Sequence, residues 1–127
     1  MADNGKYRIA VAVKTAYLAD QSDPSRNLYV FAYTITIENT GEVAAQLVSR
    51  HWIITDALHQ VQEVKGAGVV GQQPLLQPGQ RFEYTSGTSL QTVVGTMRGT
   101  YQMVAEDGHA FNADIPSFTL SVPRILH

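Results

Sequence analysis

The chain has 127 residues, of which 44% are hydrophobic and 16% charged, with a formal net charge of −2 and no cysteine. This composition excludes disulfides and cysteine nucleophiles, argues against intrinsic disorder, and gives no basic footprint for nucleic acid. We expect one domain over residues 1–127, without a cofactor. Because no apolar run approaches the ~20 residues that cross a bilayer, and no signal peptide is visible, we expect a cytoplasmic protein with no membrane insertion.

Two long segments near the start of the chain alternate apolar and polar residues with a period of two, which is typical of β-strands. They cover residues 7–17 and 29–39, and in the second one the alternating apolar set runs from Phe31 to Ile37. The sequence at residues 39–41, Asn-Thr-Gly, then predicts a turn, because asparagine and glycine tolerate the backbone conformations that turns require.

A third strand is predicted over residues 45–56. Four of its residues share one face: Val48, Arg50, Trp52 and Ile54. We assign this face to the core because the indole of Trp52 has the largest apolar area to bury.

Strand and turn signals continue through the second half of the chain. A short strand is predicted over residues 61–65, and Pro78-Gly79 predicts a turn with a positive φ angle at the glycine. Asp107-Gly108 predicts a hairpin between two further strands. The apolar residues of the last segment change parity at Pro116, and because proline donates no ladder hydrogen bond, we expect a bulge or a switch of sheet there.

These signals amount to about seven strands, and no segment of ten or more residues has a convincing helical period. The predicted fold is therefore an all-β, immunoglobulin-like or fibronectin-type-III-like antiparallel β-sandwich. A small closed barrel is the alternative.

Three glycines, Gly66, Gly68 and Gly71, have the G-x-G-x-x-G spacing of dinucleotide-binding loops. That function needs a helix after the glycines, whose first amides receive the pyrophosphate. Pro74 and Pro78 stand where this helix would run, and a helix interior disfavours proline by ~3 kcal/mol. A dinucleotide site of this kind is therefore not expected.

A simpler anion site stays open as a hypothesis, because successive amides of a glycine-rich loop can surround an anion without a helix. Its candidate residues are one lysine and the glycines that follow it: Lys65, Gly66, Gly68 and Gly71. We favour the alternative that the glycines serve a connection with positive φ angles, with Val69 and Val70 packed under the sheet edge.

A divalent-metal site is a further hypothesis, because histidine together with carboxylates suits a transition ion. Its candidate ligands lie in two predicted turns: Asp56, His59 and His109, with Glu106 and Asp107 beside the last of these. Such a site exists only if the two turns meet in space. We favour the alternative that these residues are solvent-exposed turn residues.

Three long blocks of sequence resemble a known family. They are SRHWIITDA at residues 49–57, VKGAGVVGQQPLLQPGQRFEYTSGTSLQT at residues 64–92 and GTMRGTYQMVAEDGHAFNADIPSFTLSVP at residues 95–123. On these blocks the chain resembles the ApaG (CorD) family over about residues 6–126. The resemblance implies a fibronectin-type-III-like sandwich, a genetic link to cobalt tolerance and magnesium efflux, and use of the domain as an interaction module in eukaryotic F-box and polymerase-interacting proteins. It supplies no catalytic residue.

Three functions are open at this point. The preferred one is a non-enzymatic binding domain that docks a protein partner through a sheet edge or through the loops at one end. The second is binding of a small anion or a nucleotide phosphate through the glycine-rich loop, and the third is binding of a divalent cation. No enzymatic activity is expected, since no catalytic set of residues is visible in the sequence.

Overall fold

The structure, a computed structural model, describes residues 5–123, and most of them lie in β-strands. Eight strands follow in chain order: β1 (Ile9–Tyr17), β2 (Tyr29–Asn39), β3 (Ala45–Asp56), β4 (Val61–Ala67), β5 (Leu75–Leu76), β6 (Arg81–Leu90), β7 (Val94–Ala105) and β8 (Ala110–Ser121). Two short 3₁₀ turns, η1 (Ala19–Gln21) and η2 (Pro24–Arg26), lie between β1 and β2. Within residues 5–123, no helix has the length and apolar character needed to span a membrane.

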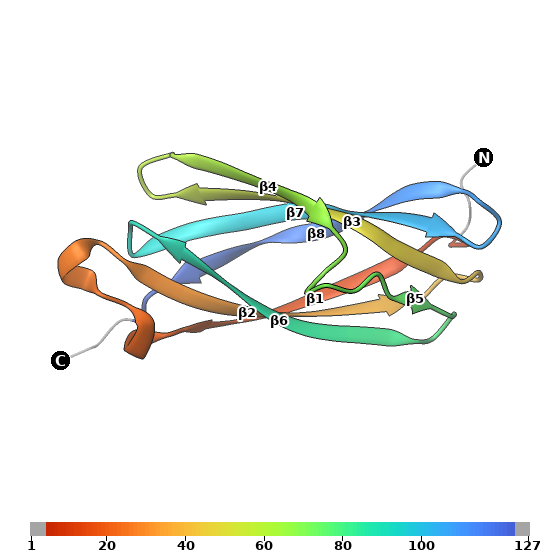
Figure 1. Ribbon diagram of the computed structural model, residues 1–127, viewed down its shortest axis with the longest axis horizontal. Coiled ribbons are helices and arrows are strands. Elements are labelled where there is room, and N and C mark those ends of the chain that lie inside the picture. Colours follow the sequence, from red (N-terminus) through yellow and green to blue (C-terminus); the bar gives the residue numbers. More distant parts are fainter. Residues whose placement is uncertain (1–4, 124–127) are drawn as a thin grey trace.

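The strands form two antiparallel sheets that stack face to face (Figure 1). In the smaller sheet, β2 lies between β1 and β6. The larger sheet has the order β4-β3-β7-β8, and the short β5 pairs with the first residues of β3, next to the end of β4. Because each sheet keeps its own two edges, the fold is the predicted β-sandwich and not a closed barrel. The two-residue β5 is the strand that the sequence pattern does not predict.

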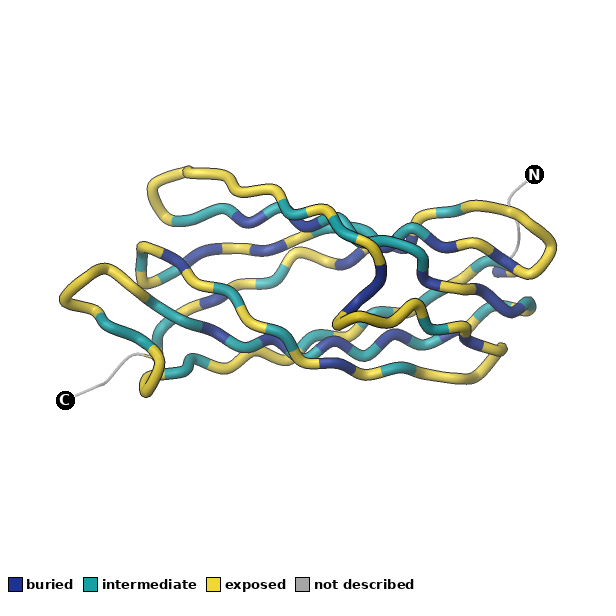
Figure 2. Tube along the Cα trace, viewed as in Figure 1, coloured by how far each residue is buried: buried dark blue, intermediate teal, exposed yellow. Residues whose placement is uncertain are grey.

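The core lies between the two sheets, where buried residues alternate with more exposed ones along the strands (Figure 2). On β2, the predicted apolar set from Phe31 to Ile37 points inward and is buried. Trp52 of β3 is 2% exposed and packs against the ring of Tyr33, at 5.3 Å between ring centroids. The assignment of the Trp52 face to the core is therefore confirmed.

β3 contains a bulge that the period-two pattern does not predict. Its pairing with β7 shifts register between Leu47 and Ser49. As a result, Leu47 and Trp52 are both buried although they differ in parity. Val48, the residue between the two shifted pairs, is half-buried. The bulge lies where β3 stops pairing with β4 and starts pairing with β5.

β8 contains a second bulge, at the position where the sequence predicts an irregularity. The register between β7 and β8 shifts at Pro116, so that Ile115 and Leu120, which differ in parity, are both buried. The strand continues in the same sheet. Of the two predicted outcomes, a bulge occurs and a switch of sheet does not.

One polar side chain is fully buried among the described residues, and it organises the turn after β2. Asn39 is 1% exposed. Its Nδ2 donates to the carbonyl oxygens of Val43 (2.8 Å) and Leu76 (2.9 Å), and its Oδ1 accepts from the amide of Gly41 at 2.9 Å. The predicted turn at residues 39–41 is thus held by its own first side chain and is joined to β5.

Candidate binding cleft

The glycine-rich segment is a connection between two strands, and a hairpin turn takes the place of the helix that a nucleotide loop needs. Gly66 lies within β4. Beyond β4, Val69 and Gln72 exchange two backbone hydrogen bonds, of 2.8 and 2.9 Å. Between them, Val70 and Gly71 have φ angles of 43° and 80°. Positive φ at both central residues is the requirement of a type I′ hairpin turn. The motif therefore has no helix N-terminus to receive a pyrophosphate.

The four residues predicted for an anion site do not converge. Lys65 faces the outer side of the larger sheet, whereas the next residue, Gly66, faces the interior of the sandwich. The amide of Gly68 donates to the carbonyl of Val48 at 2.8 Å, so it is not available to an anion. Lys65 and the backbone of Gly66 line one shallow hollow, to which Gly68 and Gly71 do not contribute.

The alternative interpretation, that the glycines serve a strained connection, accounts for most of this segment. Gly68 has a φ angle of 62°, and a Cβ atom there would lie 2.2 Å from the carbonyl oxygen of Gln72. Val69 is fully buried, as predicted. Val70 is 53% exposed, so its predicted place under the sheet edge is wrong. It is exposed because it occupies the first central position of the turn.

The predicted metal ligands lie at opposite ends of the larger sheet. Asp56 pairs with Gly95 near the start of β7, and His59 follows in the same turn, whereas His109 lies in the turn after the end of β7. At ~3.3 Å per residue, the length of β7 keeps the two turns roughly 30 Å apart, and Figure 1 shows them at opposite ends. The site of Asp56, His59 and His109 is therefore not formed. Within residues 5–123, no group of three or more histidine and acidic side chains is placed to hold a metal ion.

In each of these turns an aspartate accepts hydrogen bonds from other groups of the chain. Oδ1 of Asp56 accepts from the amides of Leu58 (2.8 Å) and Gln60 (2.9 Å). The carboxylate of Asp107 accepts from the hydroxyl group of Tyr7, and this hydrogen bond lowers the pKa of Asp107. The ring of Tyr7 stacks on His109 at 4.1 Å between centroids. The second turn is thereby attached to the segment before β1.

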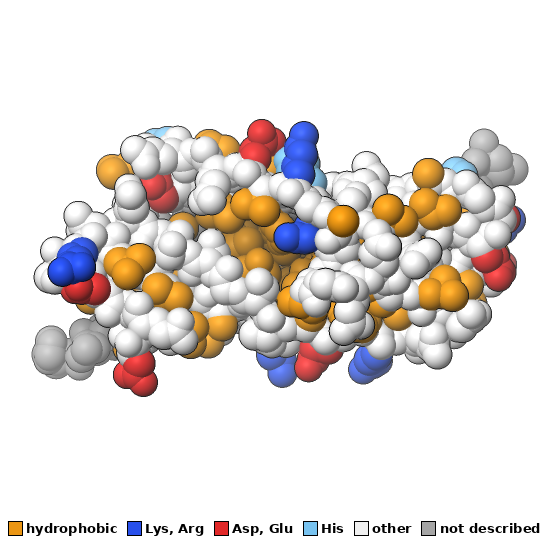
Figure 3. Space-filling model, viewed as in Figure 1, with side chains coloured by type: hydrophobic (Ala, Val, Ile, Leu, Met, Phe, Trp, Pro, Cys, Tyr) orange, Lys and Arg blue, Asp and Glu red, His pale blue; other side chains and the backbone are white. Residues whose placement is uncertain are grey.

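A cleft of about 340 Å³ opens between β4 and β6, the edge strands on one side of the sandwich. On this side the inward-facing positions carry small residues, namely Val64 and Gly66 on β4, and Ser86 and Thr88 on β6. Small side chains leave the two edges apart. On the opposite side of the sandwich, β1 and β8 contact each other. The sandwich is therefore open along one side, where Figure 3 shows an apolar hollow with a basic side chain at its rim.

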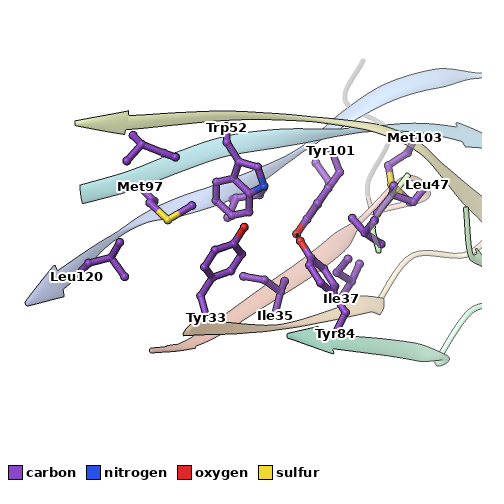
Figure 4. Close-up of a cluster of buried hydrophobic side chains, with 14 of the residues drawn as sticks. Tyr33, Ile35, Ile37, Leu47, Trp52, Tyr84, Met97, Tyr101, Met103 and Leu120 are labelled. Atoms are coloured by element: carbon purple, nitrogen blue, oxygen red, sulfur yellow. Dashed lines mark hydrogen bonds between the residues drawn. The ribbon is translucent and has the colours of Figure 1, made fainter. Parts of the chain in front are cut away.

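The floor of the cleft consists of core side chains from both sheets, among them Tyr33, Trp52 and Met97. Figure 4 shows Tyr33 of β2 and Trp52 of β3 pointing toward each other across the core. Beside them, the hydroxyl groups of Tyr84 and Tyr101 form a hydrogen bond between the sheets. A ligand in the cleft would therefore contact aromatic and thioether groups directly.

Of the residues that the structure describes, Arg50 is the one charged residue that lines this part of the cleft. Its half-buried side chain leaves β3 on the same face as Trp52 and lies over Gly66, where a Cβ atom would come within 2.8 Å of Nη1. Nη1 donates to the carbonyl oxygens of Ala67 (3.1 Å) and Gly68 (2.8 Å). Two carbonyl groups of the glycine-rich segment thus bind the guanidinium group of Arg50, a cation that belongs to the same chain. The sequence did hold a signal for this residue, since the alternation in β3 places Arg50 on the core face.

A second hollow, of about 160 Å³, continues the cleft toward the start of β4. Ile54, Gln62 and Ser89 line both parts. The continuation reaches Asp56, so the cleft has a guanidinium group near one end and a carboxylate near the other. The lining residues on this edge extend from Gln60, just before β4, to Val64 within it, a stretch of five residues that corresponds to roughly 15 Å of extended chain.

The fold and the cleft define an immunoglobulin-like or fibronectin-type-III-like β-sandwich that is open along one side. A family model described as the ApaG domain matches residues 19–105. The chain is 69% identical to Protein ApaG of Thiobacillus denitrificans and 65% identical to Protein ApaG of Dechloromonas aromatica, in both cases over 127 residues and 100% of both chains.

A solved structure is similar over nearly the whole chain. The crystal structure of a Bordetella pertussis protein described as ApaA has a TM-score of 0.91 and 58% sequence identity, and the match covers 94% of this chain and 97% of that chain. The chain belongs to the ApaG family, as the resemblance of its sequence blocks implies.

Proposed function

We propose that this chain is a non-enzymatic binding module that docks a protein partner in the cleft between β4 and β6. One observation carries the proposal: core side chains form the floor of an open cleft, and both strands that border it are edge strands. Edge strands offer backbone N–H and C=O groups to an incoming chain, which is a common mode of peptide recognition.

The side chains that line the cleft support binding over catalysis. Among residues 5–123, those that line the part of the cleft beside Arg50 provide hydroxyl groups and the amide of Gln62 but neither a histidine nor a carboxylate. General acid–base catalysis needs such a group within hydrogen-bond reach of the substrate. The carboxylate near the far end, Asp56, already accepts two backbone amides through one oxygen.

The link to cobalt tolerance and magnesium efflux that the ApaG resemblance implies is consistent with a binding module. We propose that the partner, and not this chain, handles the ion. Calorimetric titration of the purified chain with Co²⁺ and with Mg²⁺ checks this point, and we expect no saturable heat for either ion. Saturable binding of Co²⁺ that a His59→Ala variant abolishes would contradict it.

Two neighbouring residues of β4 allow a direct test of docking. Gln62 lines the cleft, and Glu63 is the next residue and faces the outer side of the sheet. Both are exposed. A photo-crosslinking amino acid is placed at each position in turn, in cells that produce the protein. We expect covalent adducts with one protein from position 62 and none from position 63, with the captured protein identified by mass spectrometry.

The control at position 63 separates docking in the cleft from random collision. No adduct from position 62, or the same adducts from both positions, would contradict the proposed function. The captured protein is then purified and titrated against the unmodified chain, and a saturable affinity is expected.

A further inference from the structure

Arg50 carries a charge that the described part of the protein does not balance. The ion pairs within residues 5–123 are Lys6–Asp107, Arg26–Asp23, His51–Glu63 and Arg81–Glu38. Arg50 is in none of them, although it is half-buried and each of those pairs includes an exposed side chain. Removing a cation from water without an anionic partner costs free energy. The two carbonyl oxygens that Arg50 contacts offset only part of this cost, because they carry partial charges.

One edge of the guanidinium group of Arg50 takes no part in the hydrogen bonds that this side chain makes within residues 5–123. The two carbonyl acceptors, on Ala67 and Gly68, both receive N–H groups from Nη1. Within the described chain, neither Nε nor Nη2 of Arg50 has a protein acceptor. These two atoms present parallel N–H groups at the spacing of the two oxygens of a carboxylate. The side chain is thus held by its Nη1 atom, and its carboxylate-binding edge remains unused.

The shape of the cleft indicates what carries the carboxylate. A small free ion would need only the Arg50 end, but the cleft continues past an apolar floor for the length of about five extended residues. In an extended segment, alternate side chains point to the same side, so an acidic residue can reach Arg50 while a second residue reaches the floor at Ile54. The carboxylate of Asp56 at the far end disfavours another acidic group there.

We infer that the cleft binds an extended acidic segment of the partner protein, with one carboxylate on the Nε–Nη2 edge of Arg50 and an apolar side chain over the floor near Trp52. This inference rests on the proposed function and adds the chemistry of the partner. It predicts that the charge of Arg50, and not only its bulk, is needed for docking.

The crosslinking experiment at Gln62 is repeated in two Arg50 variants. Arg50→Gln keeps a hydrogen-bond donor for the loop carbonyls and removes the charge, whereas Arg50→Lys keeps the charge. We expect the adduct yield to fall at least about tenfold in the Gln variant and less in the Lys variant, because an unpaired partner carboxylate is costly to bury. An unchanged yield in the Gln variant would overturn the inference and leave the proposed function standing. If the chain with the crosslinker at position 62 and with Arg50 intact forms no adduct, the proposed function itself is overturned.

A measurement on the unmodified protein keeps the inference testable if both variants fail to fold. The ¹⁵N-labelled chain is titrated with the peptide acetyl-Val-Asp-Val-Thr-Val-amide, with its Asn counterpart, and with inorganic phosphate. We expect the Asp peptide to shift the Nε–H resonance of Arg50 and the amides of residues 86–89 saturably, and less so in about 0.5 M NaCl.

Two outcomes of this titration would overturn the inference. Equal affinity of the Asp and Asn peptides would show that no carboxylate pairs with Arg50. A tighter response to inorganic phosphate than to the Asp peptide would assign Arg50 to a free anion. A preference for the Asp peptide of about tenfold or more is the expected result.

Discussion

The hydroxyl groups of Tyr84 and Tyr101 lie 2.6 Å apart and join the two sheets inside the core. Tyr84 belongs to β6 and is 7% exposed, and Tyr101 belongs to β7 and is 0% exposed. Burial raises the pKa of Tyr84 to about 12 and raises the pKa of Tyr101 as well, because the charged phenolate would lose its contact with water. The pair satisfies two polar groups that neither sheet could satisfy alone.

Replacement of either tyrosine by phenylalanine is expected to destabilise the protein. Tyr84→Phe and Tyr101→Phe each leave a buried hydroxyl group without its partner, which costs about 1–3 kcal/mol of unfolding free energy. The double variant removes both hydroxyl groups, so its loss should be smaller than the sum of the single losses. Urea unfolding of the three variants measures this, and strictly additive losses would contradict a direct hydrogen bond.

The same pair predicts a loss of stability at alkaline pH. In an unfolded chain tyrosine has a pKa of ~10, so below that pH the phenols are protonated in both states and the contribution to stability is fully present. As the pH rises from about 10 toward the pKa of Tyr84, about 12, the unfolded chain releases protons that the folded chain retains, and the unfolding free energy falls. Urea midpoints measured between about pH 8 and about pH 12 show the decline. The double Phe variant should decline less steeply, and parallel curves would count against this assignment.

The contact between Arg50 and Gly66 predicts an energetic coupling between the two residues. An alanine Cβ at position 66 would lie 2.8 Å from Nη1, so Gly66→Ala must displace the guanidinium group from its two carbonyl acceptors. We expect a loss of about 1–2 kcal/mol in the unmodified chain. In an Arg50→Ala background the same change should cost almost nothing. Thermal unfolding of the four proteins of this cycle gives the coupling, and an equal cost in both backgrounds would refute it.

The adjacent residues Val69 and Val70 should respond in opposite ways to the same substitution. Val70 has a φ angle of 43° and is exposed, and asparagine adopts this left-handed conformation more readily than a β-branched residue. Val70→Asn is therefore expected to stabilise the chain by about 1 kcal/mol.

Val69→Asn is the matched control, because Val69 is fully buried. It places an amide in the core and should destabilise the chain by about 2–4 kcal/mol. Melting temperatures of the two variants decide the matter, and a shift of the same sign in both would be inconsistent with the turn described above.

Asn39 is expected to be the most sensitive polar residue of the core. Asn39→Ala removes the hydrogen-bond partners of two carbonyl groups and one amide, with a loss of at least about 2 kcal/mol of unfolding free energy. The neighbouring exposed residue provides the control, since Thr40→Ala should change stability by no more than about 0.5 kcal/mol. Similar losses from both substitutions in urea unfolding would contradict the role assigned to Asn39.

Much of the fold follows from signals that lie close together in the chain. The alternation from Phe31 to Ile37 predicts both β2 and its buried face, because the side chains of a strand alternate between its two faces. The irregularity at Pro116 is also predictable, because proline itself lacks the ladder donor. The bulge after Leu47 has no such local cause. It arises where β3 changes partners from β4 to β5, and β5 consists of only two residues.

The candidate site was predictable only in part. Pro74 and Pro78 were enough to predict that no helix follows the glycine motif, and the structure confirms that prediction. The role of Gly66 was not predictable, because it depends on a side chain from the neighbouring strand. The alternation in β3 did place Arg50 on the core face, but it could not show that the sandwich is open there.

Local patterns and three long sequence blocks were thus sufficient to define an all-β sandwich of the ApaG family. Pairing between distant strands established the rest: it separated Asp56 from His109, and it brought Arg50 to the carbonyl groups at the end of β4. The physical reason is that period and turn chemistry are properties of a few consecutive residues. A cleft depends on which strands become edges, and on the combined size of side chains that different strands direct into the same space.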